Sequence, residues 1–382
     1  MKFLHTGDIH LGKALGEFDL SDDQEYMLDQ IIEIAIQEKV DAIMIAGDVF
    51  DRPVPNERAV RNLDSFLNKI SKTNIDVYMI SGNHDSDERL NFGSKLFQNN
   101  GIYVSSVFDG KVFKRTVKDD WGEVDIYMLP FVKASQVSLL YPDEEVEKSY
   151  EKAIRVVLEH TEVDTSRRTV LVTHQYVISG GNDPVLSGSE GRSAKFVGTL
   201  ERVSASCFDA FDYVALGHIH SAQSIGREEV RYAGTPLKYS VKDVNDEKSV
   251  TLVTMEEKGS IDWKKISLKP KRAFRHLTGE LLTLIDPRNV ENTDDYIYVT
   301  LTDEVPIDDA MSIMQQVYPR TVTLDYENQN DPNGNGLDVT KYSDEKSFEA
   351  LFREFYSMMY GEDVDEAELD IVLQAADEVG VR

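Results

Sequence analysis

The sequence predicts an α/β fold with more than one domain. Short apolar runs of strand length alternate with helical patterns through residues 1–85, and this alternation is typical of parallel strands joined by helical crossovers. The predicted strands are apolar without a break, as expected where helices cover both faces of a sheet. A chain of 382 residues with 41% hydrophobic side chains is also longer than one ordinary domain and can bury a sizeable core.

The predicted elements alternate between strand and helix from the first residues onward. A strand in KFLHTGD precedes a helix in SDDQEYMLDQIIEIAIQEK, and the pairing repeats with AIMIAGD and NERAVRNLDSFLNKIS before a third strand in DVYMISGNHD. Shorter strands follow between residues 102 and 130, and then a helix over 143–160 and strands over 169–174 and 213–218. From 225 to 268, short strands separated by turns predict that the domain closes with a second, more antiparallel sheet.

The rest of the chain divides into three further parts. After a first domain of residues 1–268, a smaller α/β pattern fills residues 269–327, where we expect a second domain. Residues 328–344 are rich in Asn, Asp and Gly and have few large apolar side chains, a composition typical of a linker. The final segment, residues 345–382, has helical periodicity.

This final segment contains an apolar helical stripe. Phe348, Phe352, Phe355 and Met359 recur at spacings of three and four residues, which places them on one face of a helix. A helical hairpin of this composition packs either onto its own domain or onto the helices of another chain. The spacing alone leaves both alternatives open.

The charge of the chain is negative and unevenly distributed. The chain has 41 Lys and Arg against 69 Asp and Glu, a net charge of -28; residues 277–382 contain 6 basic and 25 acidic side chains, a net of -19, which leaves -9 for the first 276 residues. Nucleic-acid binding needs local positive charge, and the basic stripe KKISLKPKRAFR at 264–275 has six Lys or Arg and no acid. This stripe is either a solvated strand with its linker or part of such a contact.

Composition also excludes several classes of protein. No window approaches 18 consecutive apolar residues, and the N-terminal stretch becomes polar by Asp8. We therefore expect no membrane span, no signal peptide and a cytoplasmic location without a membrane partner. The single cysteine, Cys207, excludes an internal disulfide and a thiolate zinc site.

Residues with catalytic or metal-binding chemistry follow directly after the predicted strands. They include five of the eight histidines of the chain. Because the carboxyl ends of strands in an open α/β sheet converge on one crevice, these side chains are expected to share one pocket despite their separation in sequence. They are Asp8 and His10 in GDIH, Asp48 and Asp51 in GDVFD, Asn83, His84 and Asp85 in GNHD, His174 in VTH, and His218 and His220 in GHIH.

This set of side chains predicts two metal ions. Carboxylate, amide and imidazole donors together suit Mn, Fe, Co or Zn better than the all-oxygen shells of Mg or Ca, and the set has too many donors for one ion. Two ions about 3.5–4 Å apart, with Asp48 as the natural bridge, stabilise both the attacking and the leaving oxygen of an in-line displacement at phosphorus. A single Asp-x-His or Gly-Asp motif is more often a turn or a helix cap, but five such elements after five strands favour a metal centre.

The series GDIH, GDVFD, GNHD, TH and GHIH over roughly residues 1–240 resembles the calcineurin-like metallophosphoesterase superfamily. Within it, FLHTGDIHLGK, VRYAGTPLKYS, the chain length and the helical tail resemble the SbcD family, the bacterial nuclease subunits related to those of double-strand-break repair complexes. The resemblance implies an α/β sandwich of two sheets flanked by helices, a small α/β capping domain and a C-terminal helical hairpin. Residues 1–268 would then be the nuclease domain.

The same resemblance implies roles for the polar residues at the strand ends. His84 matches the family's non-ligand histidine, which protonates the leaving oxygen or steadies the transition state, and Asp51 and Asp85 are two candidates to orient it. Two divalent ions, with manganese as the favoured metal, would be held by two sets of ligands that share Asp48. The first set is Asp8, His10, Asp48 and His220, and the second is Asp48, Asn83, His174 and His218.

By resemblance the chain is a metal-dependent exonuclease and endonuclease that acts on double-stranded DNA ends, hairpins and single strands in repair, recombination and replication. The family works with an SbcC-type ATPase that has a long coiled coil, in an assembly of two copies of each subunit, and residues 345–382 would grip that coiled coil. The metal site alone also fits a free-standing phosphodiesterase or phosphatase that acts on a small molecule. A non-catalytic scaffold with a decayed site is disfavoured because every expected ligand is present.

Overall fold

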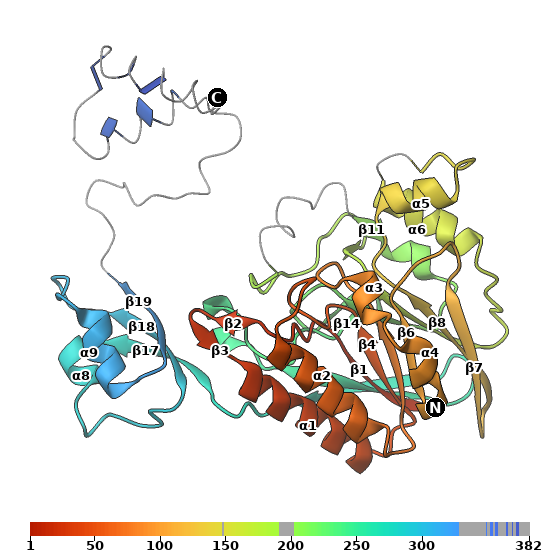
Figure 1. The fold of residues 1–382 in the computed structure, drawn as a ribbon, viewed down its shortest axis with the longest axis horizontal. Coiled ribbons are helices and arrows are strands. Elements are labelled where there is room, and N and C mark those ends of the chain that lie inside the picture. Colours follow the sequence, from red (N-terminus) through yellow and green to blue (C-terminus); the bar gives the residue numbers. More distant parts are fainter. Residues whose placement is uncertain are drawn as a thin grey trace. The chain divides into compact units, whose positions relative to one another are not determined.

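The structure is a computed structural model that describes residues 1–146, 149–190 and 202–327, together with single residues between 349 and 373 (Figure 1). The chain forms two compact units. The larger unit contains residues 1–276, 291–298 and 315–323, and the smaller one contains the remaining residues from 277 onward. The domain boundaries that the sequence predicts at 268 and 327 stay predictions.

The first sheet of the larger unit has six strands in the order β16-β15-β1-β4-β5-β6. Its parallel part consists of β1 (Lys2–Thr6), β4 (Ala42–Ala46), β5 (Asp76–Ile80) and β6 (Ile102–Ser105). The antiparallel edge consists of β15 (Ser249–Met255) and β16 (Ile261–Ser267). Because β1, β4 and β5 are parallel, the loops that follow them leave the same edge of the sheet.

The second sheet also has six strands, in the order β13-β14-β12-β9-β8-β7. Strands β8 (Gly122–Leu129), β9 (Arg168–His174), β12 (Tyr213–Gly217) and β14 (Arg227–Tyr232) run parallel to one another. Two antiparallel strands complete the sheet at its edges, β7 (Phe113–Asp119) and β13 (Gln223–Ile225).

The prediction that residues 225–268 close the domain as one separate sheet is wrong. Strand β14 joins the second sheet beside β12, whereas β15 pairs with β1 of the first sheet over His5↔Thr251 and the following residues. Both sheets are therefore mixed. The reason is that β15 covers an open edge of the parallel sheet, which would otherwise present unpaired backbone groups.

Four longer helices accompany the two sheets. Helices α1 (Ser21–Gln37) and α2 (Glu57–Ile70) connect strands of the first sheet, and α5 (Ala134–Leu140) and α6 (Tyr150–Glu159) lie between strands of the second. Two short helices, α3 (Asp87–Leu90) and α4 (Ser94–Phe97), follow β5. The helix expected over 143–160 begins only at α6, because the Ser149 side chain caps it by accepting a hydrogen bond from the Lys152 amide.

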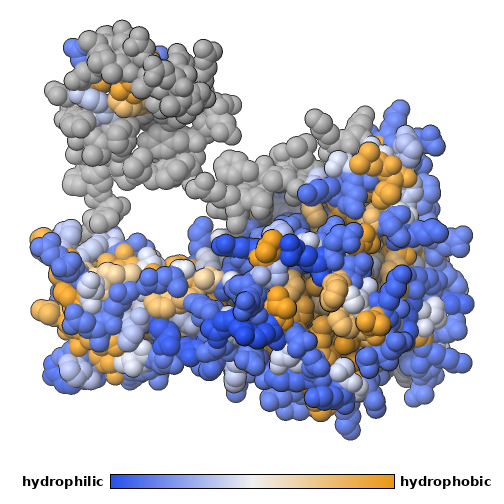
Figure 2. Space-filling view, viewed as in Figure 1, coloured by the Kyte–Doolittle hydropathy of each residue, from blue (hydrophilic) through white to orange (hydrophobic). Residues whose placement is uncertain are grey.

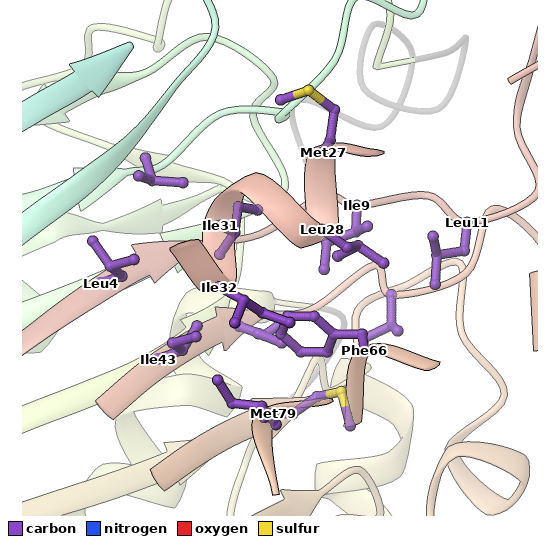
Figure 3. Close-up of a cluster of buried hydrophobic side chains, with 14 of the residues drawn as sticks. Leu4, Ile9, Leu11, Met27, Leu28, Ile31, Ile32, Ile43, Phe66 and Met79 are labelled. Atoms are coloured by element: carbon purple, nitrogen blue, oxygen red, sulfur yellow. The ribbon is translucent and has the colours of Figure 1, made fainter. Parts of the chain in front are cut away.

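Apolar side chains fill three layers of this unit. Ile43 and Ile45 of β4 face α1 and α2, whereas Met44 between them faces the other sheet. Figure 3 shows the first of these layers, in which Ile31 of α1 and Phe66 of α2 lie over the strands. Both faces of β4 are thus buried, which accounts for its unbroken apolar sequence. Side chains of the two sheets meet in the middle layer, and the fold is an α/β sandwich as predicted.

The smaller unit and its neighbouring residues carry a three-stranded sheet in the order β17-β18-β19. Its strands are β17 (Phe274–Gly279), β18 (Tyr296–Leu301) and β19 (Thr321–Tyr326), with the helices α8 (Leu281–Leu284) and α9 (Ala310–Val317) between them. Hydrophilic residues cover most of the coloured surface that Figure 2 shows, and apolar residues form smaller patches on it. The larger apolar side chains are mainly inside.

Most of the C-terminal segment falls outside the described residues. The predicted linker 328–344 and the stripe residues Phe348, Phe355 and Met359 are among those not described. Phe352 is helical and half-buried, and its ring centroid lies 6.2 Å from that of Tyr356. Among the residues that the structure describes, no helix is long and apolar enough to cross a membrane.

Candidate metal centre

The two sheets bring together the polar residues that follow their strands. Asp8 and Asp48 come two residues after β1 and β4, and His218 follows β12 directly. Their side chains are buried although they are polar, with exposed fractions of 0%, 2% and 8%. Buried charged and polar groups need partners, and such groups are often paired or coordinate metals.

The loops that carry these side chains have a constrained backbone. Asp8, His10, Asp48 and His218 have φ angles of 50°, 48°, 48° and 99°, in a region that non-glycine residues seldom adopt. Backbone hydrogen bonds from Asp8 N to Gly47 O and from His10 N to Asp48 O hold these loops together. Such conformations cost of the order of 1–3 kcal/mol each and concentrate at functional sites.

A close approach of the two sheets places His174 in the centre. A Cβ atom on Gly217 would lie only 1.9 Å from the Ala46 carbonyl oxygen, and one on Gly47 would lie 2.5 Å from His174 Nδ1. Glycine is therefore required at both positions. The approach lets His174 Nδ1 donate a hydrogen bond to Ala46 O at 2.8 Å, so Nε2 is the ring nitrogen that faces Asp48 and Asn83.

One group of donors gathers around His10. Its Nε2 lies 3.1 Å from His220 Nε2 and 3.6 Å from Asp48 Oδ2. Asp8, His10 and His220 each offer a ligand atom within 4.8 Å of the others. Two imidazole nitrogens this close have opposed lone pairs unless one is protonated or a cation lies between them.

A second group gathers on the other side of Asp48. His174 Nε2 lies 3.5 Å from Asp48 Oδ2 and 3.0 Å from Asn83 Oδ1. His218 Nδ1 lies 2.9 Å from the same Asn83 oxygen and 3.3 Å from His174 Nε2. The structure thus brings all seven predicted ligand residues into two adjoining groups, and Asp48 borders both.

The electrostatics of these groups fit divalent cations. Burial lowers the pKa of His10 and His218 to about 3 and lowers the pKa of His220 well below its usual range. Burial also raises the pKa of Asp8 well above its ordinary value. Neutral imidazole is the form that binds a metal, and a cation beside Asp8 would favour the carboxylate again.

Asp48 and His174 behave as an ion pair. Burial alone would raise the pKa of Asp48, but the charge of His174 and its hydrogen bond lower that pKa well below the usual range. Conversely, burial alone would lower the pKa of His174, and the Asp48 carboxylate raises it to about 9. Within the described chain, the buried His10 Nδ1 and His218 Nε2 have no hydrogen-bond partner, and they are the ring nitrogens opposite to those that face the other donors. The mixed set of carboxylate, amide and imidazole donors fits a metal centre.

His84 lies at the edge of the first group. Its ring centroid is 4.9 Å from that of His10, and its amide donates to Asp48 Oδ1 at 2.9 Å. Its Nδ1 donates to the backbone carbonyl oxygen of Asp51 at 2.9 Å rather than to either carboxylate that the sequence suggested. The ring is therefore oriented by main chain, and Nε2 carries the lone pair of the neutral form.

The carboxylates of Asp51 and Asp85 have partners other than the His84 ring. Asp85 accepts hydrogen bonds from the amides of Val49, Phe50 and Gly82, so it ties the loop after β4 to the loop after β5. Burial, followed by the charge of Asp48, raises the pKa of Asp85 to about 6. Asp51 accepts from Lys13 Nζ at 2.8 Å, and its carboxylate lies 3.6 Å from His10 Nδ1.

The structure also adds residues that no sequence motif marked. Ser189 Oγ lies 2.7 Å from His220 Nδ1 and 3.2 Å from Asp243 Oδ1. A carboxylate only accepts hydrogen bonds, so the hydroxyl donates to Asp243 and accepts from His220 Nδ1–H. This arrangement fixes the tautomer of His220 with its Nε2 lone pair toward His10. Glu190 accepts from the His220 amide at 3.2 Å.

Comparisons with known proteins agree with this geometry. Residues 1–222 match the family model of calcineurin-like phosphoesterases, and residues 270–360 match the model of the type 5 capsule protein repressor C-terminal domain, SbcD_C. The chain is 31% identical over 377 residues to the SbcD component of the nuclease SbcCD of Staphylococcus epidermidis, a match that covers 97% of this chain and 96% of that protein.

Solved structures show weaker similarity. A dimetal phosphatase from Danio rerio is 12% identical with a TM-score of 0.39, covering 70% of this chain and 99% of that chain. The protein TT1561 of Thermus thermophilus is 10% identical with a TM-score of 0.39, covering 69% of this chain and 98% of that chain. Similarity at this level adds nothing to the assignment.

The identity to the staphylococcal SbcD extends over nearly the whole chain, and the two family models together match residues 1–222 and 270–360. The predicted resemblance is thereby confirmed. The donors that gather where the loops of the two sheets meet are of the kind that metal-dependent hydrolases use. The chain belongs to the calcineurin-like phosphoesterases, and within them to the SbcD nuclease family, whose members are metal-dependent nucleases.

Proposed function

We propose that the chain hydrolyses DNA phosphodiester bonds with two divalent metal ions. The convergence of seven donor residues from five strand ends, six of them buried, is the observation that carries this proposal. Asp48, which borders both groups, would bridge the ions. The first ion would be held with Asp8, His10 and His220, and the second with Asn83, His174 and His218.

The two ions, when bound, supply Lewis acidity at the phosphoryl oxygens and activate a water molecule. The protein positions its donors for them. The Ala46 carbonyl sets the tautomer of His174, and Ser189 sets that of His220. The hydrogen bonds of Asp85 hold two donor loops in a fixed relation, so little reorganisation is needed when ligands bind.

His84 would supply the proton that the leaving oxygen needs. Its Nδ1 is engaged by the Asp51 carbonyl, so the proton would be exchanged at Nε2, and general acid catalysis of this kind contributes about 10²–10⁴ in rate. We assign the orientation of His84 to this carbonyl. The Asp51 carboxylate would instead hold Lys13 beside the site, and Asp85 would act on the loops.

Manganese is the metal that we propose. The mixed nitrogen and oxygen donors disfavour Mg²⁺, which prefers an all-oxygen shell. Mn²⁺ is therefore expected to support hydrolysis much better than Mg²⁺ at equal concentration, and metal analysis of the purified protein should find two ions per chain.

The staphylococcal relative is by name one component of the nuclease SbcCD. We infer that this chain likewise acts with an SbcC-type coiled-coil ATPase, as two copies of each chain, in the cytoplasm and in DNA repair, recombination and replication. We also propose residues 1–268 as the nuclease domain and 269–327 as a capping domain. The tail, with Phe348, Phe352, Phe355 and Met359, would dock on the coiled coil.

An assay of the purified chain with Mn²⁺ tests the central proposal. Linear duplex DNA, a DNA hairpin, a single strand and a chromogenic phosphodiester are compared with and without the ATPase. Hydrolysis of DNA ends and hairpins that increases with the ATPase and ATP supports the proposal. Hydrolysis of the chromogenic diester alone, with no cleavage of any DNA, would identify a small-molecule phosphodiesterase instead.

Removal of the tail tests the docking role separately. A chain truncated after about residue 340 keeps the proposed metal site, because every proposed ligand lies before residue 221. It should remain folded, bind metal and cleave the chromogenic diester and short single strands, but should lose co-purification with the ATPase and ATP-dependent cleavage of long duplex ends. Undiminished co-purification would place the docking surface elsewhere.

A further inference from the structure

A polar pocket of about 140 Å³ lies beside the loop that carries His220. Its walls include residues 220–222, residues 233–235, and the start of β15 with the loop before it. Lys265 of β16 completes it. The pocket therefore borders the metal centre but contains none of the other proposed ligands.

Lys248 contributes a buried positive charge to this pocket. The residue is only 9% exposed, and its Nζ lies 3.5 Å from the His220 carbonyl oxygen and 3.2 Å from Asp246 Oδ2. An ammonium group has three N–H donors, and these contacts use two of them. One donor remains for an acceptor inside the pocket.

Ser249, the next residue, gives an independent indication of a ligand. It is 5% exposed and lines the pocket, and in the described part of the chain its Oγ has no hydrogen-bond partner. A buried hydroxyl without a partner costs about 1–3 kcal/mol. A bound group with oxygen acceptors would remove that penalty.

Lys265 supplies the second positive charge and belongs to the basic stripe 264–275. Its Nζ donates to Ala222 O at 2.7 Å, and burial, followed by the charge of Arg231, lowers its pKa. Three other charges of the stripe have acidic partners elsewhere. Lys264 pairs with Glu38, Arg272 with Asp23 and Asp294, and Arg275 with Asp295.

Two acidic residues also line the pocket. Asp246 is already paired with Lys248, and Glu247 is exposed, where solvent and salt screen its charge. Lys265 is exposed as well, so Lys248 and Ser249 are the buried donors of the pocket. Two ammonium groups and a free hydroxyl around a cavity of this size fit a tetrahedral oxyanion such as a phosphate.

We propose that this pocket binds the backbone phosphate next to the one that is hydrolysed, with Lys248, Ser249 and Lys265 as its ligands. This inference rests on the proposed function, because it assumes a nucleic-acid strand at the metal centre. The pocket shares His220 with that centre, so a strand with one phosphate at the metals has its neighbouring phosphate within reach. Phosphate contacts of this kind fix the register of the strand without reading its sequence.

The test compares Lys265→Gln with Lys264→Gln. The two lysines are neighbours in β16 and both are exposed, but Lys264 pairs with Glu38 and does not line the pocket. The affinity for a short single-stranded DNA is measured over a range of salt concentrations with Ca²⁺ in place of Mn²⁺, a substitution meant to allow binding without turnover. The slope of log K against log salt should become less negative by about 0.7 in Lys265→Gln. It should stay at the wild-type value in Lys264→Gln.

An uncharged methylphosphonate linkage in the DNA shows which backbone phosphate the pocket binds. A single methylphosphonate is placed at successive positions of a single strand that wild type cleaves with Mn²⁺. At the position next to the cleaved bond it should lower kcat/KM of wild type about tenfold, the effect of one lost charge-assisted contact. The same substitution should have little further effect on Lys265→Gln, because the two changes remove one interaction. Hydrolysis of the chromogenic diester should be unchanged in Lys264→Gln.

The outcomes separate this inference from the proposed function. Suppose that the wild-type protein cleaves DNA. Equal salt slopes in the wild type and both lysine variants, or additive effects of Lys265→Gln and the methylphosphonate, would then overturn the phosphate pocket alone. Wild type that cleaves the chromogenic diester but no DNA would overturn the proposed function and this inference with it.

Discussion

Replacement of Ser189 by alanine tests how the chain prepares His220 to bind a metal. The Ser189 hydroxyl accepts the His220 Nδ1 proton at 2.7 Å and donates to Asp243 at 3.2 Å. Both partners are buried, with exposed fractions of 3% and 0%. The variant leaves a buried N–H donor without an acceptor and frees the ring to change tautomer.

The size of the effect follows from that lost bond. An unsatisfied buried donor costs about 1–3 kcal/mol, and loss of a residue that orients a metal-binding histidine lowers metal affinity by about 10–100-fold. These ranges agree, because 10–100-fold corresponds to about 1.4–2.8 kcal/mol. The effect should concern the ion at His10 and His220, while the ion at Asn83 and His218 binds as before.

Calorimetric titration of metal-free protein with Mn²⁺ measures the two affinities. Ser187→Ala is the matched control, because the Ser187 hydroxyl contacts Ser189 Oγ at 2.8 Å, whereas the hydroxyl that bonds the His220 ring is that of Ser189. Thermal unfolding of the metal-free proteins separates a loss of metal affinity from a general loss of stability. The reasoning is refuted if Ser189→Ala binds two ions with wild-type affinity, or if both ions weaken in proportion to a lower melting temperature.

Three further predictions concern the ligands, the proton donor and the dependence on pH. Asp8→Ala should lower the metal content per chain and abolish hydrolysis, and full activity with two bound ions would contradict its role as a ligand. His84→Ala should keep both ions and still bind DNA but lose about 10²–10⁴ in kcat; metal analysis with single-turnover kinetics decides, and loss of an ion would make His84 a ligand. Burial lowers the pKa of His5 from 6.5 to about 3, so only the unfolded chain gains its proton between these values. The free energy of unfolding should therefore fall with decreasing pH in this range, by up to about 1.4 kcal/mol per unit from this group, and His5→Gln should show a correspondingly shallower dependence in denaturant titrations.

The sequence was sufficient to predict the α/β fold, and the family resemblance the sandwich of two sheets; the strand-end motifs named the residues that the two sheets bring together. Each proposed ligand lies in a strand or within four residues after one, as in GDIH and GNHD, and parallel strands send their following loops to one edge. The position of each ligand relative to its strand was therefore enough to predict that these residues meet, even though His10 and His220 are 210 residues apart. His5, which the motifs did not include, bonds Tyr213 and the Leu216 carbonyl in the interior.

Other features depended on contacts that no local pattern contains. The division of the strands after residue 225 between two sheets follows from which edge each strand covers. The group that orients His84 is a backbone carbonyl, and every residue has one, so side-chain identity could not reveal it. Ser189 and Asp243 are 31 residues before and 23 residues after His220, as their numbers show, and neither type is diagnostic of a metal site.

The backbone of the donor loops shows why strand-end motifs and sheet packing act together. Asp8, His10, Asp48 and His218 have positive φ angles, and a loop alone would relax from such conformations because each costs about 1–3 kcal/mol. The contacts that resist relaxation come from elsewhere in the fold. Asp8 accepts from the His218 amide of the other sheet at 2.9 Å, and Asp85 accepts from the loop after β4. The strain is held only while both sheets are packed, so metal binding and the packing between the sheets are expected to stabilise each other.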